Sequence, residues 1–133
     1  KSMVEKKGLS ECVEFKGRTD DPLKGLSAEG IFLISSDYEG ISNSLLEAMA
    51  IGLPVVSTDH SPGGARLLIS DQQNGILVPV GNPEAMADAI AEFADDKALA
   101  EQCGNNARKV LERFSPGRIV NEWEEYIVSR IGK

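Results

Sequence analysis

Short apolar runs alternate with amphipathic stretches along most of the chain. The apolar runs predict four strands, at residues 13–17, 31–35, 54–58 and 75–78. The second run opens with four consecutive apolar residues, which is typical of a strand buried on both faces. Strands that alternate with helical patterns favour βαβ units. The pattern therefore predicts an α/β fold built on a parallel sheet.

Amphipathic stretches between and after these runs predict four helices. They cover residues 44–51, a segment that begins at Asn82, residues 97–114, and the segment that follows Pro116. Asn82 can cap the second helix, and Pro83 fits its first position. Because two successive helices end the chain with no strand between them, we expect the end of a doubly wound sheet.

Length and charge narrow the possible functions. The 133 residues predict a single domain over residues 1–133, with residues 115–133 as its C-terminal helix. A net charge of −7 makes sequence-independent nucleic-acid binding a poor candidate, because that function needs a basic face. The uncharged stretch at residues 48–58 is too short to cross a membrane, so no transmembrane segment is expected.

The start of the chain and its two cysteines add two expectations. Lys1 replaces the usual methionine and no signal-peptide pattern follows, so we expect a piece of a longer protein. Cys12 and Cys103 lack C-x-x-C spacing, which argues against a disulfide scaffold or a structural zinc site. Both are expected to be reduced core cysteines of a cytosolic protein.

The candidate site is the segment of residues 35–47, which leads from a buried strand through a small polar loop into a helix. Ligands of open parallel sheets bind at this end of the strands, and a helix N-terminus presents free N–H groups to anions. Gly40 allows close approach of the backbone, and Ser42, Asn43 and Ser44 add polar donors. This pattern predicts a phosphate or diphosphate site that needs no lysine or arginine.

Two glutamates flank this loop, Glu39 and Glu47, with seven residues between them. With Glu39 in the loop and Glu47 on the first turns of the helix, both carboxylates can face one pocket. A carboxylate suits a ribose diol, because it accepts hydrogen bonds from two neighbouring hydroxyls. Two simpler interpretations stay open. Ser44 to Glu47 matches a capping box, in which Glu47 caps its own helix, and Glu39 can be a solvated loop acid.

Other residues near this edge leave further interpretations open. Asp37 and Glu39 could hold a divalent metal, although only two carboxylates are adjacent. His60 could act as an acid or base, or could be structural or exposed. Arg66 follows a Gly-Gly pair and could bind a phosphate or simply cover the loop at the surface.

Several segments resemble one family. Residues 39–59 resemble the E-x7-E signature and following strand of the group 1 glycosyltransferases, which have the GT-B fold. Further matching segments are residues 13–17, residues 74–82, Ala107-Arg108 and Phe114-Ser115. The resemblance covers nearly the whole chain. It implies a Rossmann-like, doubly wound parallel sheet, the C-terminal half of a GT-B glycosyltransferase truncated at its N-terminus.

The resemblance also implies roles for the site residues. Such enzymes transfer a sugar, with retention of anomeric configuration, from a nucleotide diphosphate sugar to an acceptor hydroxyl. Glu39 would be the catalytic residue beside the donor sugar, and Glu47 would bind the ribose hydroxyls. The other donor-binding residues would be Gly17 and Arg18 near the base, and Gly40, Ile41, Ser42, Asn43 and Ser44 at the diphosphate. Helix N–H dipoles would meet the charge on the leaving diphosphate, so no metal and no other cofactor is implied.

The function implied is donor binding in a retaining, hexosyltransferase-like enzyme that uses a UDP-sugar in surface-glycan biosynthesis. A glycan or lipid-linked glycan acceptor would bind through an N-terminal domain outside this chain, so the fragment alone is expected to be inactive. The full-length protein would be cytoplasmic, with a peripheral position at the inner membrane as an option. The alternative is a non-catalytic nucleotide-sugar-binding or interaction module that partners a separate catalytic chain.

The sequence departs from the family pattern in three ways. The first is the absence of the family's N-terminal domain, which carries the acceptor site and usually a catalytic histidine. The family's G-G-x-x-E reads G-G-A-R-L at residues 63–67, so no acid stands at that position. The arginine–lysine pair that clamps the diphosphate would lie before Lys1. In the family's fold the last helix packs toward the other domain, so Trp123, Tyr126 and Ile127 are expected to be partly exposed in this chain.

Overall fold

The computed structural model describes residues 1–18 and 30–131. Its elements are α1 (Ser2–Lys6), β1 (Phe32–Ile34), α2 (Asn43–Ala50), β2 (Val55–Thr58), α3 (Gly64–Leu68), β3 (Ile76–Val78), α4 (Pro83–Asp95), α5 (Lys97–Ala107), α6 (Val110–Arg113) and α7 (Pro116–Ile131). The described strands form one parallel sheet in the order β1-β2-β3. In its register Phe32 pairs with Val55, and Val56 pairs with Ile76.

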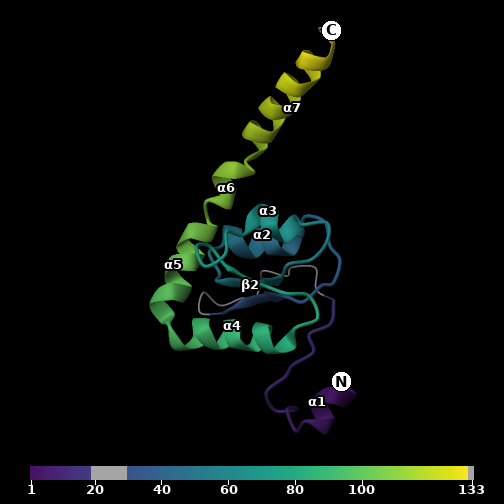
Figure 1. Cartoon of the computed structure of the whole chain (residues 1–133), viewed down its shortest axis with the longest axis vertical. Helices are drawn as coiled ribbons and strands as arrows, with labels where there is room; N and C mark the ends of the chain where they lie inside the picture. The colour runs from purple at the N-terminus through teal and green to yellow at the C-terminus, as the bar shows by residue number, and fades with distance from the viewer. Residues whose placement is uncertain (19–29, 132–133) are drawn as a thin grey trace.

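Helices cover both faces of this sheet, with α2 and α3 on one face and α4 on the other (Figure 1). The central strand β2 is buried along its whole length. Because neighbouring strand residues point to opposite faces, Val55 packs in a cluster with Leu45 and Met49 of α2, whereas Val56 packs with Phe93 of α4. The structure therefore confirms the doubly wound α/β fold.

Two expected elements are wrong. Residues 13–17 form no strand, and Phe15 is 52% exposed. A segment forms a β-strand only when it is hydrogen-bonded to a neighbouring strand, and residues 13–17 pair with no other strand in the described part of the chain. The helix expected over residues 97–114 is divided into α5 and α6. Tighter i→i+3 bonds, such as Leu111 N–H to the Arg108 carbonyl at 3.0 Å, turn the chain there.

The C-terminal helix α7 extends away from the sheet and buries none of its residues (Figure 1). The exposed fractions of Trp123, Tyr126 and Ile127 are 61%, 53% and 48%, so the expected exposure of these three side chains is confirmed. Trp123 and Tyr126 contact each other edge to face, with ring centroids 6.1 Å apart. In the described part of the chain, no helix has the length and apolar character that a membrane crossing requires.

The two cysteines lie in different environments. Cys103 is a core residue as expected, but Cys12 is exposed, so its expected burial is wrong. Residues 9–13 are all exposed, so this segment does not pack against the core. Burial raises the pKa of the Cys103 thiol, and the negative charges of Glu92 and Asp71 raise it further. Little Cys103 thiolate therefore forms near neutral pH.

We expect a thiol reagent such as DTNB to distinguish these cysteines. In the folded protein Cys12 reacts quickly, whereas Cys103 reacts on the order of 100-fold more slowly, because its thiol is buried and its thiolate is scarce. The Cys103 rate rises with pH, since a raised pKa moves thiolate formation to more alkaline solution. Cys12→Ser leaves only the slow thiol, and denaturant makes it fast. Equal rates for both thiols in the folded protein would contradict the described burial.

Candidate functional site

Two loops at the carboxyl edge of the sheet are joined by hydrogen bonds. The loop after β1 carries Glu39, whose N–H donates to the carbonyl of Ser61 in the loop after β2 at 3.1 Å. The Thr58 hydroxyl at the end of β2 donates to the Ser36 carbonyl at 2.5 Å. The first of these bonds is part of a parallel bridge between Tyr38 and Ser61. The segment that carries Glu39 is therefore held in place by the end of β2.

Gly64, the first residue of α3, packs against this segment through backbone alone. A Cβ atom at Gly64 would lie 1.8 Å from the carbonyl oxygen of Gly40 and 3.0 Å from the Ile41 nitrogen. Only glycine allows this approach. The sequence marked the place with its Gly-Gly pair, but it did not indicate that Gly40 was the partner.

Helix α2 begins immediately after this contact. Its N-cap is Ser42, whose Oγ accepts the Leu45 N–H at 3.4 Å and lies 2.9 Å from Ser44 Oγ. Asn43 and Ser44 are exposed in the first turn. The helix starts one residue earlier than expected, because Ser42 rather than a later residue makes the cap. A polar helix start is therefore present where the sequence predicts one, and its role as an anion site stays a prediction.

The two glutamates lie on either side of that helix start. Glu39 is in the loop, half-buried, and its Oε2 accepts the Ser36 hydroxyl at 3.2 Å, so it is not a fully solvated acid. Glu47 is exposed on α2. A capping box would need its acid three residues after the Ser42 cap, and that position holds Leu45. The capping-box interpretation of Glu47 is therefore wrong, and its place at a ribose stays a prediction.

Gly17 and Arg18 are the remaining predicted donor residues. Gly17 and Arg18 are exposed in a segment without regular structure, and Gly17 has a φ of +70°. No hydrogen bond between described residues ties either of them to residues 35–44. Their position near a nucleotide base stays a prediction.

Three further polar residues lie on the loop after β2 and on α3. Arg66 donates from Nε and Nη2 to Oδ2 of Asp59, at 2.8 and 2.5 Å. These hydrogen bonds, together with the negative charge of Asp59, raise the pKa of Arg66. His60 is 1% exposed, so its interpretation as an exposed residue is wrong, and its ring nitrogens have no partner among the described residues. The described part of the chain contains no cluster of three or more potential metal ligands.

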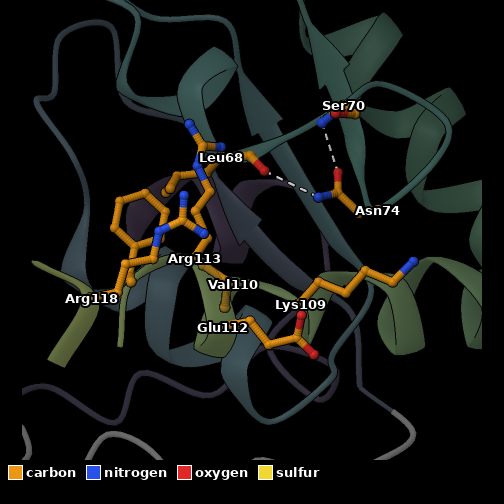
Figure 2. A pocket seen from close by; sticks show the side chains of 9 residues that line it. Leu68, Ser70, Asn74, Lys109, Val110, Glu112, Arg113 and Arg118 are labelled. Carbon is orange, nitrogen blue, oxygen red and sulfur yellow. Dashed lines mark hydrogen bonds between the residues drawn. The ribbon is translucent and has the colours of Figure 1, made fainter. Parts of the chain in front are cut away.

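A pocket of about 320 Å³ lies elsewhere, between the C-terminal end of α3 and the helices α6 and α7 (Figure 2). Asn74 closes one side of it, donating to the Leu68 carbonyl at 3.1 Å and accepting the Ser70 N–H at 2.7 Å. None of the predicted site residues lines this pocket. The loop–helix unit at the carboxyl edge, which the sequence motifs predict, stays the candidate site.

Known proteins resemble both the sequence and the fold. The family model for glycosyl transferases group 1 matches residues 1–110. The poly(ribitol-phosphate) alpha-N-acetylglucosaminyltransferase of Staphylococcus aureus is 35% identical, over 91% of this chain and 24% of that protein. The lipopolysaccharide core biosynthesis glycosyltransferase LpsE of Rhizobium meliloti is 32% identical, over 92% of this chain and 36% of that protein.

Among solved structures, Anabaena Alr3699/HepE in complex with UDP superposes with a TM-score of 0.85 at 26% identity, over 96% of this chain and 35% of that one. The chain thus spans between a quarter and about a third of the length of these three proteins. The structural neighbours are GT-B glycosyltransferases, which agrees with the fold expected for a C-terminal half. Since the family model matches most of the sequence, the chain belongs to the group 1 glycosyltransferases.

Proposed function

We propose that this chain is the donor-binding part of a retaining glycosyltransferase that uses a UDP-sugar. One observation carries the proposal: a polar helix start, capped by Ser42, lies between Glu39 in a hydrogen-bonded loop and Glu47 on α2. The UDP bound in the structure of Anabaena HepE supports a uridine nucleotide as the ligand. The acceptor would bind through an N-terminal domain outside this chain, so the chain alone would be inactive.

In this proposal the residues act by binding and orientation. The free N–H groups at the start of α2 and along the backbone of Gly40 to Ser44 donate hydrogen bonds to the diphosphate, and their dipoles stabilise its negative charge as it leaves. Glu47 accepts hydrogen bonds from the ribose hydroxyls. Glu39, held by the Ser36 hydroxyl and by its own N–H, faces the transferred sugar. No step requires a metal ion.

The names of two relatives support a proposal for the acceptor and the process. They include the LpsE enzyme of lipopolysaccharide core biosynthesis and a poly(ribitol-phosphate) transferase. These names support a surface glycan, or a lipid-linked precursor of one, as the acceptor. A cytoplasmic location at the inner membrane would suit that process.

The ribose assignment can be tested by calorimetric titration of the full-length protein. Glu47→Ala is expected to weaken UDP binding by about tenfold, because a charge-assisted hydrogen-bond acceptor is lost. The same substitution should remove the protein's preference for UDP over 2′-deoxy-UDP, which lacks one ribose hydroxyl. Glu101→Ala serves as the control, since Glu101 is an exposed acid on α5. Unchanged UDP affinity in Glu47→Ala would show that Glu47 does not bind the ribose.

A further inference from the structure

The carboxyl edge of the described sheet is acidic apart from one arginine. The three loops that leave the strands there contain three carboxylates and no lysine or arginine; the loops are residues 35–42, 59–63 and 79–82, and the acids are Asp37, Glu39 and Asp59. Among the first turns of α2, α3 and α4, which follow these loops, Arg66 of α3 alone brings a positive charge. Within these loops and first turns, Glu84 of α4 adds a fourth carboxylate, so a phosphate meets four acids and one cation there.

Asp59 holds the Arg66 guanidinium in a defined orientation. Both hydrogen bonds, from Nε and Nη2, go to the same carboxylate oxygen. A guanidinium has five N–H donors, so most of them stay available. The Arg66 side chain is 69% exposed, and an exposed ion pair of this kind contributes little to stability. The pair thus presents a fixed, charged fork to solvent rather than stabilising the core.

The end of β2 connects this ion pair to the candidate site. Asp59 follows Thr58, whose hydroxyl donates to the Ser36 carbonyl, and lies two residues before Ser61, whose carbonyl accepts the Glu39 N–H. Ser36 and Glu39 belong to the loop that leads into the N-terminus of α2. The hydrogen bonds and negative charge of Asp59 raise the pKa of Arg66, so its guanidinium is charged at neutral pH.

We propose that Arg66 binds a phosphate group of a substrate at this edge, through the guanidinium donors that Asp59 leaves available. The inference rests on the proposed function, because the phosphate belongs either to the diphosphate of the donor or to a phosphate-bearing acceptor. Asp59 is then a positioning residue that orients Arg66. Planar guanidinium groups bind phosphate oxygens in pairs, which a lysine cannot do.

The test measures binding by the full-length protein in two arms. The first arm titrates UDP and uridine, which differ only in the diphosphate. Arg66→Gln is expected to weaken UDP binding by about tenfold, or about 1.4 kcal/mol, and to leave the affinity for uridine unchanged. The second arm titrates inorganic phosphate into the UDP-saturated protein, where the same variant is expected to lose binding if the acceptor supplies the phosphate. A loss in either arm supports the proposal and identifies the source.

Arg118→Gln is a matched control, because Arg118 forms an exposed ion pair with Glu122 on α7, away from this edge. Arg66→Lys should recover less than half of the lost binding free energy, since it restores the charge but not the fork. If wild type binds UDP and Arg66→Gln has the same affinities as wild type in both arms, the role of Arg66 is overturned while the proposed function stands. If wild type binds no UDP, the proposed function is wrong, and the role of Arg66, which depends on it, is wrong as well.

Discussion

Glu39→Gln in the full-length protein is expected to lower kcat for sugar transfer by about 100- to 1,000-fold. The carboxylate faces the transferred sugar in the proposed site, and glutamine removes its negative charge with almost no change of shape. The amide oxygen can still accept the Ser36 hydroxyl, so the loop keeps its place. UDP affinity should therefore change by less than about threefold. Product formation gives kcat, and calorimetry gives the affinity.

Asp37→Asn is the control for this prediction. Asp37 is exposed two residues before Glu39, and it is the other carboxylate of the metal interpretation. If transfer needs no metal, Asp37→Asn should retain at least half of the wild-type kcat, and excess chelator should leave the rate unchanged. A loss of activity in Asp37→Asn together with inhibition by chelator would favour a metal held by both carboxylates. Wild-type kcat in Glu39→Gln would remove Glu39 from catalysis.

The fold could be predicted from the sequence where a segment carries its own signal. Asn82 and Pro83 mark the start of α4, and the structure shows Asn82 Oδ1 accepting the Ala85 N–H at 3.0 Å. Residues 13–17 carry a strand pattern, but strand formation depends on a neighbouring strand, which a sequence pattern does not reveal. The turn between α5 and α6 was missed because Val110 continues the apolar face of α5 into the same core cluster as Ala107.

The candidate site was predicted in part for the same reason. The polar helix start and the two flanking glutamates are local features, and the structure has them in the predicted order. The cap at Ser42 and the contact between Gly64 and Gly40 depend on how two loops meet, so neither could be read from spacing. The Asp59–Arg66 pair likewise joins residues seven positions apart across a turn.

Gly64→Ala is the substitution for which we expect the largest loss of stability. The new Cβ would lie 1.8 Å from the Gly40 carbonyl oxygen. This clash is with a backbone atom, which cannot relieve it by a change of rotamer as a side chain could. Gly64 is buried, so either α3 or the Glu39 loop must move. We expect a loss of about 2–4 kcal/mol in the free energy of unfolding and a Tm lower by about 10 °C.

The consequence for the site distinguishes this contact from ordinary core packing. If the loop moves, Glu39 and the start of α2 move with it, so the full-length Gly64→Ala protein should bind UDP at least about tenfold more weakly even well below its Tm. Gly117→Ala is the control: no atom lies within 4 Å of a Cβ at Gly117, which is in α7, and alanine favours a helix, so its stability should equal or exceed wild type. Thermal unfolding followed by circular dichroism measures both variants. A Gly64→Ala protein as stable as wild type would mean that α3 and the Glu39 loop do not touch through their backbones.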